Sequence, residues 1–392
     1  MSETAQRNRF SLHEWTGSIG DLGTLLPLAF ALVVYNGFAG SHLFFLWGLA
    51  YLATGLIFKV PLSIQPLKVM TVIAITQGLS PDLLSTTAFF YGLLFILIST
   101  TGTINVLQKW FSQVLVSGIQ LGIGLVLGLK AIQLIMENGT FLSMESGAGM
   151  LNPAIFIAVV AVVLWLQHRQ QQLWAVLVLV VLSGLIIMGV DHATPTLSQR
   201  SLINPSLPNP TILFNVTILL IIPQLPLTLG NAVFAAAETA HDLWGKQAQR
   251  VTPQRLGLSI GIVNTAIGLL GGFPICHGAG GLAAHAQFGA RTGGSTIIIG
   301  GILILAALLP AFSTLIFLVP VPILAAVLFV DGFRMVTLVG KLSLPSDYAT
   351  ATLMGVITVI TGNMAIGLGV GLLMEQGFKY FKINEAKGIS HD

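Results

Sequence analysis

The stretch GGFPICHGAGGLAAH, residues 271–285, combines residue types that can bind an anion inside a membrane. It holds five glycines, one proline and two histidines, and it lies between long apolar flanks. A plain bilayer-spanning helix would not contain this mixture. Irregular backbone at membrane depth leaves polar groups that are costly in hydrocarbon, so it is found only where protein buries it or a cavity receives it.

The composition of this stretch predicts a half-helix that begins at Cys276 or His277, after an extended segment that Pro274 ends. Gly278 and Gly280 have no side chains, so a ligand can approach the backbone amides closely. The helix N-terminus adds free N–H donors and about half a unit of positive charge, which suits an anion. Two alternatives stay open: the glycines serve close helix packing, or His277 is a structural hydrogen-bonding group.

A second short apolar stretch, residues 64–78, repeats the same design. Pro66 lies near its start, Gln65 supplies a polar donor, and Lys68 follows in the first helical turn. Two half-helix N-termini that meet near the membrane midplane, with a lysine and a histidine added, predict a site for a small dianion. The alternative for Lys68 is that its side chain extends from a helix end to the membrane surface.

Two longer apolar segments also carry polar residues that a lipid-facing helix would lack. Asp21 and Thr24 lie in the first segment, and Gln224 and Asn231 lie in the segment 211–237. We expect these four side chains to line the region where the half-helices cross. An acidic group in the membrane is a functional hypothesis by default. Asp21 could pair with Lys68, carry a coupling proton, or be a structural group bonded to Thr24 or to glycine amides.

Composition indicates a polytopic membrane protein. The 392 residues are 54% hydrophobic and only 8% charged, with a mean hydropathy of +0.89. Soluble domains carry about a quarter charged residues. The single cysteine excludes internal disulfides, and the net charge of +3 is too small to indicate nucleic-acid binding.

Fourteen membrane elements are expected, all of them helical. A spanning helix needs about 20 apolar residues, and each of the two short stretches has room for about half of the crossing. Each short stretch is third in its half of the chain, so the elements divide as seven plus seven, with the second half inverted. The expected parts are a first repeat, 1–190, an external linker, 191–210, and a second repeat, 211–392. The twelve long segments are 17–37, 42–59, 84–106, 112–136, 151–167, 173–190, 211–237, 255–271, 295–318, 320–334, 347–362 and 364–378, and the short ones are 64–78 and 275–287.

The distribution of basic residues predicts the orientation. With the N-terminus inside, fourteen Lys and Arg residues fall on the cytoplasmic side and only Arg200 falls outside. Lys68 and Lys130 fall within the membrane. This bias follows the positive-inside rule, so both termini are expected to be cytoplasmic.

Four blocks of the sequence resemble the signature blocks of the molybdate transporter family, a branch of the sulfate-permease-like anion transporters. They are GDLGTLLPL (20–28), PLSIQPLK (61–68), PQLPLTLGNA (223–232) and FPICHGAGGLAAHAQFGARTGGS (273–295). The resemblance covers nearly the whole chain. It implies a seven-plus-seven inverted repeat with a core and a gate domain, and an oxyanion bound between the third and tenth elements. It also implies molybdate uptake, with sulfate as a related substrate.

The sequence therefore predicts a secondary transporter that imports a tetrahedral oxyanion across the inner (plasma) membrane by alternating access. Moving a dianion against a negative interior costs about 4.6 kcal/mol per 100 mV, so a coupled proton is expected. An anion channel and a nucleobase carrier on the same fold are the alternatives, and a homodimer is left open. An enzyme is not expected, because the chain has no G-x-S-x-G, H-E-x-x-H or phosphate-loop motif, and no cofactor is expected.

Overall fold

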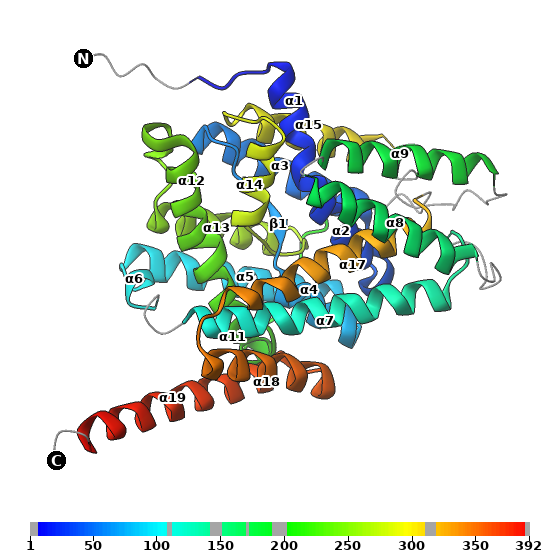
Figure 1. Ribbon diagram of the computed structural model, residues 1–392. Helices are drawn as coiled ribbons and strands as arrows, with labels where there is room; N and C mark the ends of the chain where they lie inside the picture. Colours follow the sequence, from blue (N-terminus) through cyan, green and yellow to red (C-terminus); the bar gives the residue numbers. More distant parts are fainter. Residues whose placement is uncertain are drawn as a thin grey trace.

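The computed structural model describes residues 7–107, 112–141, 151–169, 172–189, 202–309 and 319–388. Within these ranges the protein is mostly helical, with connecting turns and two strands of two residues each, β1 and β2; Figure 1 labels β1. Each of the fourteen elements expected from the sequence has a counterpart in the described residues, either a helix or a short strand that leads into a half-helix.

The first half runs from a long N-terminal span to a pair of helices, α8 and α9. Its first span runs from Leu12 to Asn36, and a short 3-10 turn within it joins two α-helices. The elements are α1 (Leu12–Ser18), η1 (Ile19–Asp21), α2 (Leu22–Asn36), α3 (Gly40–Phe58), β1 (Gln65–Pro66), α4 (Lys68–Gln77), α5 (Pro81–Thr100), α6 (Ile104–Leu107), α7 (Gln113–Glu137), α8 (Leu151–His168) and α9 (Gln172–Gly189).

The second half begins with a span that changes helix type several times between Pro210 and Ala248. Pro223 and Pro226 lack the N–H that an α-helix needs, and π-helical turns flank the segment that contains them. The elements are η3 (Pro210–Ile212), α10 (Leu213–Val216), η4 (Thr217–Ile221), α11 (Ile222–Leu227), η5 (Thr228–Ala235), α12 (Ala236–Trp244), η6 (Gly245–Ala248), α13 (Pro253–Leu269), β2 (Ile275–Cys276), α14 (Ala279–Gln287), α15 (Gly294–Leu308), α17 (Val321–Thr337), η7 (Leu338–Lys341), α18 (Pro345–Thr361) and α19 (Met364–Gly388).

Helix pairing follows the inverted repeat. In the first half α3 is second and α5 is fourth, and α13 and α15 hold these places in the second half. α3 packs on α15 and α5 packs on α13, so exchanging the halves maps one pair onto the other. The third elements meet each other through the strands, and the fifth elements, α7 and α17, also pack together.

Glycines allow the two exchanged helix pairs to approach closely. A Cβ on Gly48 of α3 would lie 2.9 Å from the carbonyl oxygen of Gly300 in α15. A Cβ on Gly92 of α5 would lie 2.7 Å from the carbonyl oxygen of Gly261 in α13. Small residues at such crossings are what membrane helices use to pack backbone against backbone.

The helices form two bodies that correspond to the core and gate domains. α7 packs with α17, α18 and α19, and α8 packs on α17; these helices form the gate. The first four elements of each half form the core, with β1, α4, β2 and α14 at its centre (Figure 1). The gate touches the core mainly where α17 meets α2 and where α7 meets α4 and α11.

Large apolar side chains cover the outer surface. Met188, Phe214 and Ile360 are 87%, 74% and 77% exposed, and seven described helices are long and apolar enough to cross a membrane. Patches of this kind on a soluble protein would cause association, whereas a bilayer receives them. The protein is therefore an integral, multi-pass membrane protein.

The buried carboxylate of Glu14 occupies the N-terminal end of α15. Its Oε1 accepts hydrogen bonds from the backbone N–H groups of Arg291 (3.1 Å) and Thr292 (2.9 Å), and its Oε2 accepts one from Ser295 (3.2 Å). The side chain is only 2% exposed. A helix N-terminus favours negative charge, so Glu14 attaches α1 to α15 as a built-in anion.

We expect Glu14→Gln to lower the free energy of unfolding by about 2 kcal/mol, because hydrogen bonds to a charged acceptor are stronger than neutral ones. Thermal unfolding of the detergent-solubilised protein measures the loss. Glu238→Gln, at an exposed position of α12, is the matched control and should leave stability unchanged. Equal stability of the two variants would contradict this role of Glu14.

Candidate functional site

A two-stranded antiparallel sheet brings the two half-helices together. Gln65 of β1 lies opposite Cys276 of β2, and Pro66 lies opposite Ile275. Beyond the strands, the Leu67 N–H donates to the Pro274 carbonyl at 3.0 Å. Since α4 and α14 start shortly after their strands, the antiparallel sheet fixes where the two helices begin, at opposite ends of the paired strands.

Side chains pair with further backbone groups at the entry to α14. Asn264 of α13 accepts from the Ile275 N–H at 2.7 Å and donates to the Ile275 carbonyl at 2.8 Å. The Trp47 indole donates to the Phe273 carbonyl at 3.2 Å. The irregular backbone expected from the sequence is thus buried in protein and paired, as the hydrocarbon environment requires.

Pairing of the strands also moves the start of α14. The helix begins at Ala279, with Gly278 in the capping position, rather than at Cys276 or His277 as the sequence suggested. Ile275 and Cys276 are held extended by β1, so the first helical turn forms later. Lys68 is the first residue of α4, as expected, but Pro66 belongs to the strand and not to the helix.

Asp21 links the first span to both half-helices. Gln65 Nε2 donates to Asp21 Oδ1 at 2.5 Å, and the Tyr51 hydroxyl contacts Asp21 Oδ2. Nε2 of His285, on α14, lies 3.9 Å from the same Oδ2. The pairing of Asp21 with Lys68 that the sequence suggested is therefore wrong, because Gln65 and Tyr51 reach the carboxylate first.

The glycines at the start of α14 have different surroundings. A Cβ on Gly278 would lie 2.6 Å from Gln65 Oε1, and one on Gly281 would lie 2.5 Å from Asp21 Oδ1. A Cβ on Gly280 would meet nothing within 4 Å. Gly278 and Gly281 thus allow close packing against the Asp21–Gln65 pair, whereas Gly280 leaves open space beside the helix N-terminus.

Lys68 pairs with a residue that the sequence analysis did not single out. Its Nζ lies 3.7 Å from Oδ2 of Asp331 on α17, and the two side chains are 16% and 10% exposed. Thr24 Oγ1 donates to Asp331 Oδ1 at 3.4 Å. An acid inside the apolar segment 320–334 was the available signal, since intramembrane acids are rare without a role.

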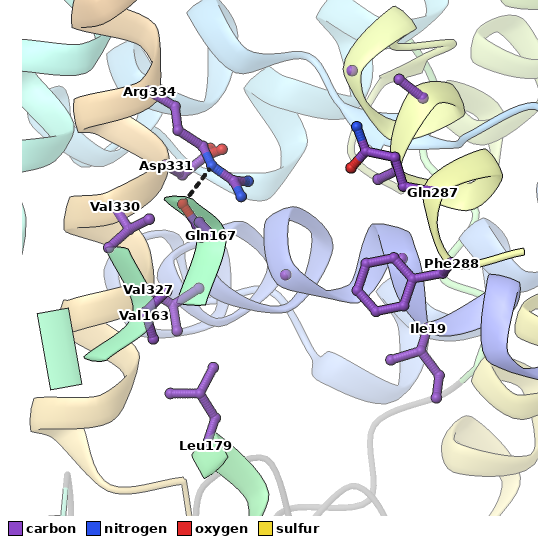
Figure 2. Close-up of a pocket in the computed structure, with 15 residues that line it drawn as sticks. Ile19, Val163, Gln167, Leu179, Gln287, Phe288, Val327, Val330, Asp331 and Arg334 are labelled. Carbon is purple, nitrogen blue, oxygen red and sulfur yellow. Dashed lines mark hydrogen bonds between the residues drawn. The ribbon is translucent and has the colours of Figure 1, made fainter. Parts of the chain in front are cut away.

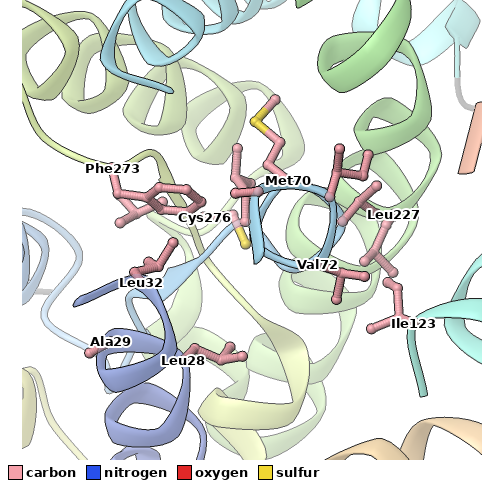
Figure 3. Close-up of a cluster of buried hydrophobic side chains, with 14 of the residues drawn as sticks. Leu28, Ala29, Leu32, Met70, Val72, Ile123, Leu227, Phe273 and Cys276 are labelled. Carbon is pink, nitrogen blue, oxygen red and sulfur yellow. The ribbon is translucent and has the colours of Figure 1, made fainter. Parts of the chain in front are cut away.

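The side chains of His277 and Cys276 are engaged in contacts within the core. His277 is fully buried, with Nδ1 3.1 Å from the Ser63 carbonyl and Nε2 3.0 Å from Ser259 Oγ. The Cys276 side chain lies in an apolar cluster with Leu32 and Met70 (Figure 3). His277 therefore fastens β2 to the β1 segment and to α13, and Cys276 packs the strand against the core.

Gln224, in the first span of the second half, contacts the first turn of α4. Its Oε1 accepts from the Met70 N–H at 3.2 Å, and its Nε2 donates to Thr228 Oγ1 at 2.9 Å. Asn231 is half-buried further along in η5. Of the two residues predicted in this span, Gln224 directly contacts a half-helix N-terminus.

A cavity of about 410 Å³ separates the core from the gate at this site. Figure 2 shows its two walls: Ile19, Gln287 and Phe288 on one side, and residues of α8, α9 and α17 on the other. Arg334 Nε donates to Gln167 Oε1 at 3.2 Å across the gate wall. The lining residues from the core and gate include Gly20, Gly23, Gly280, Ala283, Ala284, Gln287, Gln167, Asp331 and Arg334.

Apart from the Met70 N–H, which donates to Gln224, the two half-helix N-termini keep hydrogen-bonding capacity that α15 has used. The capping residues of α4 and α14, Leu67 and Gly278, provide no side-chain hydrogen bond, whereas Glu14 fills the end of α15. The first turn of a helix has N–H groups without intrahelical partners. The α14 N-terminus borders the cavity at Gly280, and the Lys68 ammonium at the start of α4 pairs with Asp331 of the cavity wall, so these groups can act together on an anion.

Comparison with known proteins identifies relatives along most of the chain. A family model described as "Molybdate transporter of MFS superfamily" matches residues 13–127 and 216–335. "Molybdate transporter 2" of Arabidopsis thaliana is 24% identical over 412 aligned residues, which cover 92% of this chain and 86% of that protein.

Two solved structures share the fold. The transmembrane domain of the cyanobacterial bicarbonate transporter BicA superposes with a TM-score of 0.68 at 17% identity, covering 92% of this chain and 96% of that one. The murine Solute Carrier 26 family member A9 anion transporter superposes with a TM-score of 0.66 at 12% identity, covering 96% and 69%. These likenesses support the inverted-repeat architecture of the core and gate.

We expect Gly281→Ala to lower the free energy of unfolding by about 2 kcal/mol or more, because its Cβ would displace the buried Asp21–Gln65 pair. Thermal unfolding in detergent measures this. Gly280→Ala, on the adjacent residue with open space, is the matched control and should be neutral or slightly stabilising. If both substitutions had the same effect, the packing assigned to Gly281 would be wrong.

Proposed function

Because the chain belongs to the molybdate transporter family, we propose that it is a secondary transporter that imports a tetrahedral oxyanion, molybdate first and sulfate second. Membership supports the broader class of anion transport, and the relatives named above are transporters rather than enzymes. One observation carries the proposal: the N-terminus of α14 lines a cavity between core and gate, and Asp331 in the wall of that cavity pairs with Lys68 at the N-terminus of α4.

The oxyanion is proposed to bind between α4 and α14. Lys68 supplies the charge, and the first-turn N–H groups at Gly280 and its neighbours supply fixed donors. The hydrogen bond from Gln65 to Asp21 holds β1, and with it the start of α4, in position beside the site. Fixed dipoles and one ammonium suit a dianion, because they replace the donors of water without further buried charges.

The other predicted residues receive positioning roles in this proposal. Cys276 and His277 keep β2 in register, and Gly278 allows the strand to pack on Gln65. Asp21, Thr24, Gln224 and Asn231 line the region where the spans cross around the half-helices. Asp21 and Gln224 contact the start of the first half-helix, through Gln65 and Met70, and Thr24 contacts the gate, through Asp331.

The cavity between core and gate supports alternating access as the mechanism. Arg334, Arg291 and Arg169 lie in segments that the positive-inside rule places on the cytoplasmic side. The cavity is accordingly proposed to open toward the cytoplasm, with both termini on that side and the linker 191–210 outside. Movement of the core against the gate would then expose the half-helices to either face.

We expect Lys68→Ala to weaken molybdate binding and low-substrate uptake by about tenfold or more, since a charge-assisted contact to the anion is lost. Calorimetric binding to the purified protein and uptake into proteoliposomes measure the two effects. The variant should remain folded, because Lys68 is at the start of α4 and partly exposed.

Lys246→Ala, at an exposed position in η6, is the matched control and should bind and transport normally. Tungstate and sulfate should compete with molybdate, whereas uracil should not. Normal binding by Lys68→Ala would remove this lysine from the site. Competition by uracil would favour a nucleobase carrier, and flux without accumulation against a gradient would favour a channel.

Uptake is further proposed to be coupled to protons, because a dianion enters against a membrane potential that opposes it. An acidic exterior should raise the initial rate of molybdate uptake into proteoliposomes several-fold, and a protonophore should abolish the increase. The matched measurement sets equal pH on both sides at each exterior pH used. If imposed gradients leave uptake unchanged, proton coupling fails while oxyanion binding can stand.

A further inference from the structure

We propose that Asp331 is an internal competitor of the substrate: its carboxylate takes the place on Lys68 that the oxyanion needs, and thereby links the gate to the core. This inference rests on the proposed function, since it concerns how the oxyanion site is opened. It assigns to Asp331 a role in substrate affinity and in the alternating-access transport cycle, through its ion pair with Lys68.

The geometry makes Lys68 the shared partner of the two anions. Asp331 Oδ2 lies 3.7 Å from the Lys68 ammonium and has no hydrogen-bond partner among the described residues. Among the described residues, the other oxygen, Oδ1, accepts one long bond, 3.4 Å, from Thr24. The carboxylate is thus held mainly by charge, and an oxyanion with more charge can displace it.

The other cation near Asp331 does not take over this pairing in the structure. Arg334 is one turn further along α17 and also lines the cavity, but its Nε donates to Gln167 of α8. On the core side, Lys68 of α4 and Thr24 of α2 are the groups that contact the carboxylate. Displacement by an oxyanion would therefore leave Asp331 without its counter-charge.

The pair joins two bodies that must move relative to each other. Lys68 belongs to the central half-helix of the core, and Asp331 lies on α17, which packs on α7 in the gate. While the pair is formed, it ties α4 to α17 and occupies the substrate's lysine. Binding of the oxyanion would break the Lys68–Asp331 ion pair and fill the site in one step. The substrate-bound state and the ion-paired state would therefore exclude each other.

Competition of this kind has a measurable effect on affinity. When a site is open for only a fraction of the time, the apparent affinity equals the affinity of the open site multiplied by that fraction. If the pair closes the site about nine-tenths of the time, Asp331→Asn should bind molybdate about tenfold more tightly. Its maximal uptake rate should not rise with the affinity, because the tie that helps to release the substrate is lost.

The experiment measures molybdate binding by calorimetry for the wild-type protein, Asp331→Asn, Lys68→Ala and the double variant. Asp331→Asn should bind about tenfold more tightly than wild type, and the increase should vanish in the Lys68→Ala background, because both anions use the same ammonium. Asp242→Asn, an exposed carboxamide control on α12, should bind as wild type does.

The outcomes separate this inference from the proposed function. Wild-type protein that binds none of molybdate, tungstate and sulfate overturns the function, and the inference with it. Wild-type binding together with equal or weaker binding by Asp331→Asn overturns the inference alone. Tighter binding that persists in the Lys68→Ala background also overturns it, because the effect would then not pass through Lys68.

Charge reversal tests the tie without any substrate. Lys68→Asp combined with Asp331→Lys should recover most of the melting temperature that each single substitution loses, and it should not bind molybdate. Recovery of stability with loss of binding supports the pair as a connection between core and gate. No recovery, with both single variants folded, would show that the pair does not join the two bodies.

Discussion

Pairing of β1 with β2 is the constraint on which the site depends. Two extended segments inside hydrocarbon must satisfy their backbone groups, and they do so on each other and on Asn264 and Trp47. Each strand leads into a half-helix, so the pairing also fixes two electropositive helix ends, of which that of α14 borders the cavity at Gly280. Gly278 and Gly281 permit this arrangement because a Cβ at either position would collide with Gln65.

Three carboxylates show how the fold treats negative charge near helix ends. Glu14 is fully committed to the backbone of α15 and acts as a structural anion. Asp21 receives side-chain donors and holds Gln65 in place. Asp331 has the weakest set of partners, a lysine at 3.7 Å and a long bond from Thr24. The contacts become weaker from Glu14 to Asp21 to Asp331. The most weakly held carboxylate, that of Asp331, lies in the cavity wall.

The inverted repeat explains why the site lies between moving parts. Exchanged pairs, α3 with α15 and α5 with α13, fasten the two halves of the core through close glycine contacts. The gate is fastened in the same way around α7 and α17, where a Cβ on Gly332 would lie 2.7 Å from the Gly124 carbonyl oxygen. Between these two well-packed bodies the contacts are fewer, and the cavity occupies part of the space. A ligand that bridges the bodies can therefore shift their relative position at low cost.

Hydrophobic length and interruption by Pro and Gly determined the element order, the two half-helices and the inverted repeat, because these properties are local to each segment. They also predicted Gln65, Lys68 and Gly280 at the half-helix starts. The start of α14 and the partners of Glu14, Asp21 and Asp331 were decided only by the tertiary structure. Each depends on which residues, far apart in the sequence, are brought within hydrogen-bonding or ion-pair distance. A carboxylate in an apolar segment looks the same in the sequence whether it caps a helix, orients a glutamine or holds a lysine, since the difference lies in the neighbours that packing supplies.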